Sequence, residues 1–446
     1  MNSVEIVTFG CRLNAVESDA IRRLADDADL RDTVIVNTCA VTAEAERQAR
    51  QTIRRARREH PRARIIVTGC AATLAPDRYA ALAEVDLVLD NEAKLRPESY
   101  LSLVAPEFAT SPQPSPPPGA DRELPPRPQI PSPPFRGERE GSTPQAWEGE
   151  ATVETAATPK PRARAYLQVQ QGCDHRCTFC IIPYARGPSR SVLLDDIIAQ
   201  ARALLASGYR EIVLTGVDLT AYGADLPEKL TLGQMVRQLL AAIPELPRLR
   251  LSSLDPSEID EDLWHALADE PRLMPHLHLS LQAGDDLILK RMKRRHSRAQ
   301  AIAAARRAHA LRPDIALGAD LIAGFPTETE DMFGRSLDII EACGLAFVHV
   351  FPYSPRPGTP AARMPQLDPV LVRERAARLR AAAAAGLMAE LSARIGSQAD
   401  VLIESSGRGR ADCYAGVRFE GALPTGSVVR MRFTAVTADS LIGVPA

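Results

Sequence analysis

Short apolar runs alternate with helical patterns along most of this 446-residue chain. Such alternation predicts strand–helix–strand units, whose strands lie parallel because each crossover helix carries the chain back to the same edge of the sheet. Residues 1–106 hold the first units and form the predicted N-terminal domain. Its expected strands are 4–8, 33–36, 65–68 and 85–89. Its expected helices are 15–25, 43–58 and 76–83.

The first three of these strands each end at a cysteine. Cys11, Cys39 and Cys70 stand about 30 residues apart, one after each apolar run. A single such cysteine is most simply a small buried side chain. Ligands of open parallel sheets bind beyond the carboxyl ends of the strands, however, so three cysteines in this position converge. We therefore expect them to hold an iron–sulfur cluster with one open iron.

Three further cysteines, Cys173, Cys177 and Cys180, form the pattern C-x3-C-x2-C directly after an apolar run at 165–169. A structural zinc site takes four protein ligands, usually from paired cysteine knuckles. Three closely spaced thiolates instead suit a [4Fe-4S] cluster that leaves one iron open. An open iron can chelate S-adenosylmethionine and pass it an electron, which releases a carbon radical.

Residues 162–390 repeat the strand–helix pattern six times, which predicts a partial (βα)6 TIM-like barrel. Binding sites in such barrels lie at the carboxyl ends of the strands. Candidate contacts to S-adenosylmethionine on that rim are Gly216, Ser253, Gln282 and Asp320. Three histidines within the strands are interpreted as core or edge residues: His276, His278 and His349. The expected strands are 165–169, 211–214, 248–251, 276–280, 316–321 and 346–351.

Two segments depart from the α/β pattern. Residues 107–161 hold 14 of the 36 prolines and little apolar sequence, which predicts an extended, disordered linker. Residues 391–446 follow a long helix that begins at Asp368-Pro369, and they are predicted to form a small all-β barrel. Its expected strands are 399–404, 412–417, 428–434 and 440–444.

The net charge of −2 predicts no general attraction to nucleic acid, so RNA binding requires local basic patches. One candidate is the arginine-rich stretch 47–64, which is either an RNA-binding face or a solvated helix surface; another is the arginines of the tail. No apolar run approaches 18 residues, and we predict a cytoplasmic protein without a membrane partner.

Residues 8–14, 36–42 and 67–70, together with 171–186 and 351–354, resemble the motifs of the radical-SAM methylthiotransferases. Within that family the chain looks most like the enzymes that modify threonylcarbamoyladenosine in tRNA. The resemblance implies two [4Fe-4S] clusters and S-adenosylmethionine, with Phe179 beside the bound cofactor. It also implies that the β tail is a TRAM-like RNA-binding domain.

The function implied by the resemblance is methylthiolation at C2 of the modified adenosine 3′ of the anticodon. Its partners are then the tRNA anticodon loop, a flavodoxin- or ferredoxin-like electron donor and a sulfur source. Three alternatives stay open: methylthiolation of isopentenyl-adenosine in tRNA, methylthiolation of a ribosomal-protein aspartate, and a non-catalytic iron–sulfur sensor that binds RNA.

Overall fold

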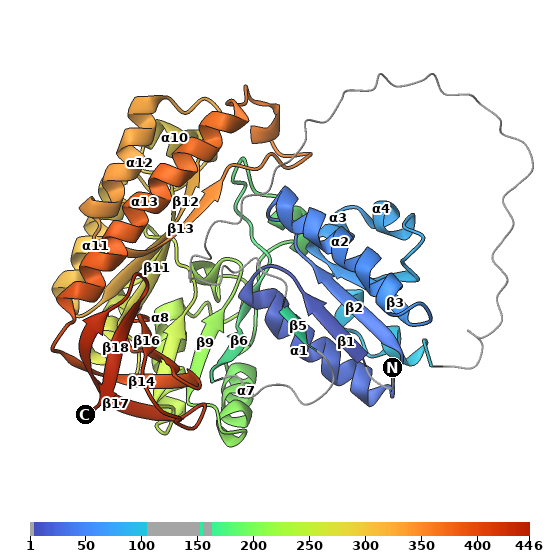
Figure 1. Cartoon of the computed structure of the whole chain (residues 1–446), viewed down its shortest axis with the longest axis horizontal. Helices are drawn as coiled ribbons and strands as arrows, with labels where there is room; N and C mark the ends of the chain where they lie inside the picture. The colour runs from blue at the N-terminus through green and yellow to red at the C-terminus, as the bar shows by residue number, and fades with distance from the viewer. Residues whose placement is uncertain (1–3, 105–151, 155–162) are drawn as a thin grey trace, which may run out of the picture.

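The computed structural model describes residues 4–104, 152–154 and 163–446 of the chain. Its N-terminal unit is a five-stranded sheet with the order β4-β3-β2-β1-β5 (Figure 1). The first four strands are parallel, as predicted, although β4 is shorter than the apolar run that predicts it. The strands are β1 (Val4–Thr8), β2 (Thr33–Thr38), β3 (Arg64–Gly69), β4 (Leu87–Val88) and β5 (Thr152–Glu154).

Helices cover both faces of this sheet, which explains why nearly every residue of β1, β2 and β3 is buried, rather than every second one. On one face, Ile21 of α1 packs with Ile35; on the other, Ile53 of α2 packs with Val36. The hydroxyl of Thr42 caps α2 by accepting a hydrogen bond from the backbone of Ala45 (3.1 Å). The helical elements are α1 (Arg12–Asp27), α2 (Ala43–Glu59), α3 (Cys70–Leu74), α4 (Pro76–Ala80), η1 (Ala93–Leu95) and α5 (Glu98–Leu101).

Strand β5 corrects one prediction. It lies inside the segment 107–161 that the proline content predicts to be without structure, yet it pairs antiparallel with β1, Thr152 opposite Thr8. The reason is local: residues 152–154 lack proline, and the open edge of β1 offers unpaired backbone groups. The rest of the predicted linker, 107–151 and 155–161, lies outside the described residues.

The central unit is the predicted partial barrel of six parallel strands. Continuous strand pairing divides it into two halves, β10-β9-β6 and β11-β12-β13. The halves are joined by backbone hydrogen bonds at two isolated bridges, Leu249 with Leu273 and Leu254 with Leu279. The strands are β6 (Ala165–Gln168), β9 (Glu211–Thr215), β10 (Arg248–Leu251), β11 (His276–Gln282), β12 (Ala316–Ala323) and β13 (Leu345–Pro352).

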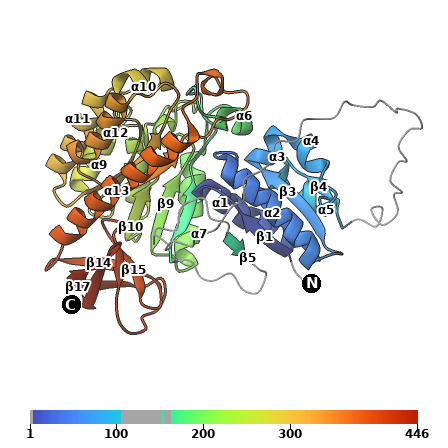
Figure 2. The same cartoon turned by 45° about the horizontal axis from the view of Figure 1, so that its top comes forward.

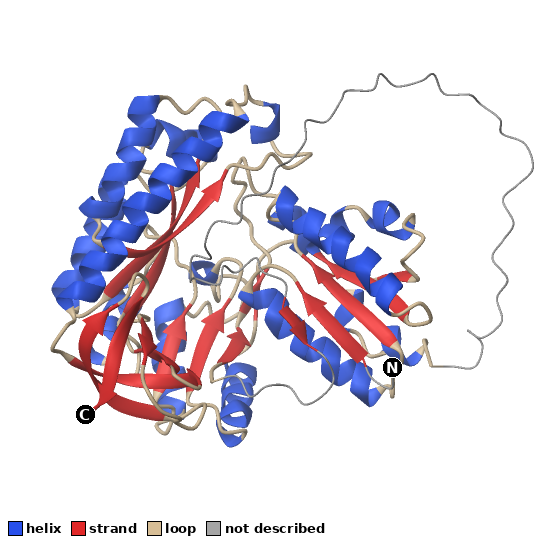
Figure 3. Ribbon diagram, in the orientation of Figure 1, coloured by secondary structure: helices blue, strands red, loops and turns tan. Residues whose placement is uncertain are grey.

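Helices cover the outer side of this partial barrel (Figure 3). Two of them begin with a complete capping box, in which Thr231 and Ser297 bond the backbone three residues on and a glutamine returns the bond. The helices are α6 (Ile182–Arg186), α7 (Leu194–Ala206), α8 (Leu232–Ala242), α9 (Glu261–Asp269), α10 (Asp286–Met292), α11 (Arg298–Leu311), α12 (Glu330–Ala342) and α13 (Pro369–Ala393). A short hairpin pairs β7 (Gln170–Gln171) with β8 (Arg190–Ser191).

The tail is a closed five-stranded barrel, β14-β15-β16-β18-β17, which lies against the central unit (Figure 2). Its core joins that of the central unit through Phe347 and Leu391. The single strand predicted at 412–417 is wrong: residues 412–415 form a tight turn, in which the backbone N–H of Ala411 bonds the carbonyl of Ala415 (2.9 Å). The strands are β14 (Gln398–Ser405), β15 (Arg408–Ala411), β16 (Gly416–Arg418), β17 (Val428–Val436) and β18 (Ser440–Pro445).

Contacts between the first two units determine where a site can form. Helix α1 lies against β6, and α3 lies against α6. These contacts bring the carboxyl edge of the N-terminal sheet to the rim of the partial barrel. Among the described residues, the helices include none with the length and apolar character needed to cross a bilayer.

Candidate functional site

The three N-terminal cysteines meet as the strand ends predict. Cys11 precedes α1, Cys39 follows β2, and Cys70 begins α3. All three line one cavity of about 290 Å³, here called the shared cavity because the central unit forms its other wall. We refer to these three residues as the N-terminal cysteine set.

Two glycines permit this convergence. A Cβ atom on Gly10 would lie 2.7 Å from the sulfur of Cys39, and one on Gly69 would lie 2.3 Å from the carbonyl oxygen of Thr38. Both residues also have positive φ angles, +96° and +94°, which favour glycine. The strand ends therefore approach each other only because no side chain stands between them.

The pKa of the Cys39 thiol reflects how closely the three cysteines approach one another. Burial raises this pKa to about 12 together with the neighbouring Cys11 and Cys70, because thiolates this close repel one another. A metal ion or cluster that replaces the protons removes this penalty. The donor set therefore fits an iron–sulfur cluster.

The central cysteine set (Cys173, Cys177 and Cys180) lies in one loop, which contacts the end of α10 in the barrel. Within the loop, the backbone N–H of Cys180 bonds the carbonyl of Cys177 (3.2 Å). Thr178 fixes the loop to the end of α10, since its hydroxyl donates to the carbonyl of Arg291 (2.8 Å) and its N–H to that of Met292 (3.0 Å). These bonds hold the loop in place, and all three thiols come from the loop rather than from a strand.

Charged neighbours act differently on these three thiols. Burial and, after it, the carboxylate of Asp218, 3.6 Å from the sulfur, together raise the pKa of Cys173 to about 12. Burial also opposes ionisation of Cys177, but hydrogen bonds from His175 and from Arg294 (Nη1 to Sγ, 3.6 Å) outweigh it, and its pKa is lowered. Cys177 is thus the thiol of this set that most readily becomes a ligand.

The central unit supplies the second wall of the shared cavity, from the carboxyl ends of its strands. Four residues predicted to contact S-adenosylmethionine lie in this wall: Gly216, Ser253, Gln282 and Asp320. Gln282 stands at an irregularity of β11 with a φ of +70°, which turns the chain at the rim. The structure therefore brings these four residues together with the N-terminal cysteine set.

Two histidines of this wall were not predicted to be functional. Nε2 of His278 and Nδ1 of His349 lie 2.9 and 3.1 Å from the same oxygen of Asp320. Burial opposes ionisation of Asp320, but the two imidazoles hold its pKa well below its usual range. Both histidines line the shared cavity, whereas His276 is buried and stacks on Tyr414, as the core interpretation predicts.

A smaller cavity of about 190 Å³ adjoins the shared one, because Gln282 and Asp320 line both. Its other walls are largely apolar and include Phe179, Ile322 and Tyr353. Flat apolar walls with a few polar groups at one end suit a planar ring such as adenine. Phe179, which stands between Cys177 and Cys180 in the sequence, links this cavity to the central cysteine set.

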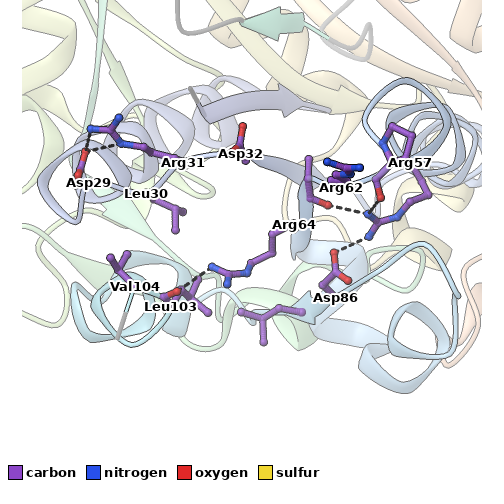
Figure 4. A pocket seen from close by; sticks show the side chains of 13 residues that line it. Asp29, Leu30, Arg31, Asp32, Arg57, Arg62, Arg64, Asp86, Leu103 and Val104 are labelled. Atoms are coloured by element: carbon purple, nitrogen blue, oxygen red, sulfur yellow. Dashed lines mark hydrogen bonds and ion pairs between the residues drawn. The ribbon is translucent and has the colours of Figure 1, made fainter. Parts of the chain in front are cut away.

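A larger hollow, about 840 Å³, lies at the opposite edge of the N-terminal sheet (Figure 4). It is lined by arginines from the basic stretch of α2 and the following loop. Arg57 pairs with Asp86 (2.6 Å), and Arg64 donates to the carbonyl of Leu103 (3.0 Å). These arginines are engaged in holding the sheet edge, and the hollow offers no sulfur ligand among the described residues that line it.

Comparisons with known proteins agree with this geometry. The Radical SAM superfamily matches residues 167–340, and the uncharacterised protein family UPF0004 matches residues 3–90. A threonylcarbamoyladenosine tRNA methylthiotransferase (MtaB) from Rickettsia prowazekii is 42% identical over 97% of this chain and 95% of its own length. The chain belongs to the radical-SAM methylthiotransferase family.

Two further relatives are less similar to this chain than the Rickettsia prowazekii enzyme. The corresponding enzyme of Aquifex aeolicus is 32% identical over 96% of this chain and 99% of its own length. A tRNA-2-methylthio-N(6)-dimethylallyladenosine synthase of Novosphingobium aromaticivorans is also 32% identical, over 98% of this chain and 96% of its own. Membership makes the chain an enzyme that transfers a methylthio group and uses S-adenosylmethionine and [4Fe-4S] clusters.

Proposed function

We propose that this enzyme methylthiolates C2 of threonylcarbamoyladenosine next to the anticodon of tRNA. The observation that carries the proposal is the shared cavity, in which the N-terminal cysteine set faces the rim of the radical-SAM barrel. Identity to the Rickettsia prowazekii enzyme supports the substrate, because at 42% it exceeds the identity of 32% and 34% to dimethylallyladenosine enzymes.

The residues divide into three roles. Cys173, Cys177 and Cys180 would hold the cluster that binds S-adenosylmethionine, and the N-terminal cysteine set would hold a second cluster. When bound, these groups supply a 5′-deoxyadenosyl radical and a site for sulfur, which the reaction requires because an aromatic C2–H has no acidic proton and no leaving group. The smaller cavity suits the adenine of S-adenosylmethionine, between Phe179 and Ile322.

The polar residues that line the shared cavity would orient a bound ligand. Asp320 accepts hydrogen bonds from His278 and His349 and fixes both rings at the edge of the cavity. A Cβ atom on Gly216 would lie 2.8 Å from the side-chain oxygen of Gln170, so glycine is needed here for Gln170 to pack against this strand end. Gln282 lines both cavities, so its amide can bond a ligand in either.

Access for RNA comes from outside the cavity. Single-stranded loops expose bases that can be turned outward into a pocket, and an anticodon loop is such a substrate. The C-terminal barrel carries exposed arginines suited to the phosphate backbone, among them Arg408, Arg418 and Arg432. An electron donor of the flavodoxin or ferredoxin type and a sulfur source complete the reaction, which we place in the cytoplasm.

Nucleoside analysis tests the substrate. The reconstituted enzyme is incubated without oxygen with S-adenosylmethionine, sulfide, dithionite and tRNA from cells that lack methylthiotransferases. We expect methylthiolated threonylcarbamoyladenosine by mass spectrometry of the digested tRNA. Methylthiolated isopentenyl-adenosine would instead support the second candidate, which the dimethylallyladenosine relatives favour. Cleavage of S-adenosylmethionine with neither product would overturn the tRNA substrate.

A further inference from the structure

A buried network of charges lies directly behind the N-terminal cysteine set. Its centre is Glu17 of α1, whose two carboxylate oxygens accept from Arg186 of α6 (2.7 and 3.0 Å). One of these oxygens also accepts from Nζ of Lys94, at 2.6 Å. The three side chains are only 0–1% exposed. The network therefore joins three segments that are far apart in the sequence.

Neutral side chains complete the network. The guanidinium of Arg186 also donates to Asn14 (2.7 Å) and Gln171 (3.2 Å), and Nζ of Lys94 also donates to Asn91 (2.7 Å). The amide of Asn91 in turn donates to the carbonyl of Ala185 (2.8 Å) and lies 3.7 Å from the sulfur of Cys70. The network thus reaches a predicted cluster ligand directly.

The three ionised groups do not balance: two cations surround one carboxylate, which leaves one excess positive charge in the interior. Burying unbalanced charge is costly, and well-packed apolar residues would join the same elements at similar or better stability. A nearby anion removes that cost. Arg186 lines the shared cavity together with Cys11, Cys39 and Cys70. An anionic group held on these three cysteines is therefore the charge that the excess cation faces.

We propose that the Glu17–Arg186–Lys94 network stabilises the anionic iron–sulfur group on Cys11, Cys39 and Cys70 and raises its midpoint potential. The potential of such a cluster depends on its net charge, on hydrogen bonds to its sulfurs and on its exposure to solvent. The network adds positive charge where water is excluded, so it favours every state of the group that carries more negative charge. The inference rests on the proposed assignment of these cysteines as cluster ligands.

A purely structural role makes a different prediction. If the network served only to pin α6 against α1, any substitution that weakens it would loosen the site in the same way. An electrostatic role instead depends on the sign of the charge removed. Lys94→Met takes away a cation and leaves Glu17 paired with Arg186, whereas Glu17→Gln takes away the anion and keeps a side chain of the same shape.

The test uses the full chain with Cys173→Ala/Cys177→Ala/Cys180→Ala, so that only the N-terminal set can hold a cluster. Iron and sulfide are measured, and the midpoint potential is obtained by redox titration followed by electron paramagnetic resonance. Lys94→Met is expected to lower the ratio of reduced to oxidised cluster at a given potential about tenfold, about 59 mV for one electron. Glu17→Gln is expected to shift it in the opposite direction. Lys290→Met, which removes an exposed lysine, serves as the matched control and should leave it unchanged.

The outcomes separate this inference from the assignment on which it rests. Opposite shifts with retained iron support the electrostatic role. Shifts in the same direction, no shift in either variant, or loss of iron from both would overturn it in favour of a structural role. Failure of the cysteine background itself to bind iron would overturn the ligand assignment, and the inference with it.

Discussion

Each of the two cysteine sets offers three thiols, but the two sets differ in how the fold brings their thiols together. The N-terminal set takes one cysteine from each of three parallel strand ends, so the whole sheet must form before the thiols meet. The central set lies within one loop, which short-range turns and the end of α10 hold in place. The first site is therefore a product of tertiary structure, and the second is mostly a product of local sequence.

Their electrostatic surroundings also differ. The N-terminal set faces the Glu17–Arg186–Lys94 network, with one excess positive charge. Around the central set, three carboxylates meet two guanidinium groups and His175: Asp218, Asp255 and Glu258 against Arg294 and Arg295. The imidazole of His175 can carry the third positive charge, so the central set has no excess of cations. A cluster without excess positive charge beside it is harder to reduce, so we expect the central cluster to have the lower potential of the two.

Removing either set of thiols is expected to have the largest effect, because each set should be needed for a different product. Cys173→Ala/Cys177→Ala/Cys180→Ala is expected to abolish formation of 5′-deoxyadenosine, because nothing then reduces S-adenosylmethionine. Cys11→Ala/Cys39→Ala/Cys70→Ala is expected to keep that reaction and abolish the methylthiolated nucleoside. Iron analysis and chromatography of the products measure both effects, and each variant should hold about four of about eight irons. Cys343→Ala is the control, since Cys343 is a buried packing residue. Loss of all iron from either variant would show that the two sites are not independent.

Glycine substitutions test how each set is positioned. In Gly69→Ala the new Cβ meets the Thr38 backbone at 2.3 Å, and in Gly172→Ala it meets the Pro188 carbonyl oxygen at 1.8 Å. We expect the first to lose the N-terminal iron and the second the central iron. Gly208→Ala is the matched control: its φ is also strongly positive, +92°, but nothing lies within 4 Å.

Thermal unfolding of the same three variants distinguishes the backbone penalty of a positive φ from the steric clash of the new Cβ atom. Gly208→Ala should cost about 1–2 kcal/mol, the penalty for a left-handed backbone alone. The other two should cost more, because backbone must move as well. If all three variants were equally destabilised and kept the iron of both clusters, Gly69 and Gly172 would have no role in positioning the cysteines.

Charge around the central set can be changed without touching a thiol. Asp218→Asn removes the carboxylate 3.6 Å from the sulfur of Cys173, which should raise the potential of the central cluster. Reduction of S-adenosylmethionine should then slow about tenfold, which corresponds to about 1.4 kcal/mol in the barrier. The rate of 5′-deoxyadenosine formation measures this, with Asp262→Asn on the outside of α9 as the control. A faster rate would contradict the low-potential interpretation.

The elements were predictable from the sequence because their signals are local. Apolar runs indicate β1 to β3 and all six barrel strands, and the cysteines can be placed at strand ends from these alone. The Glu17–Arg186–Lys94 network has no such signal, since its members come from three separate segments and meet only through packing of α1, α6 and η1. The turn at 412–415 was missed because its residues resemble the continuation of a strand.

His278 and His349 lie between these extremes. Each interrupts an apolar strand, and Asp320 does the same on the strand between them, so three polar side chains on adjacent buried strands were a usable signal. Taken one at a time, the histidines are most simply core residues. The register pairs Asp320 with His349, and this cross-strand neighbourhood turns three isolated residues into one cluster.

Asp320→Asn gives the smallest expected effect and tests the wall that both sites share. Asparagine keeps one acceptor oxygen but removes the charge that holds both imidazoles, so His278 and His349 should lose their fixed orientation. No cysteine is touched, so iron content should stay near wild type, and the acceptor oxygen that asparagine keeps beside the smaller cavity should limit the loss of 5′-deoxyadenosine formation. The yield of methylthiolated nucleoside per 5′-deoxyadenosine should fall about threefold, about 0.7 kcal/mol in partitioning. His265→Gln, an exposed histidine of α9, is the control. If 5′-deoxyadenosine and the methylthiolated nucleoside fell equally, Asp320 would act on the central set alone. Only a residue that acts on both sites can change the yield of one product per molecule of the other.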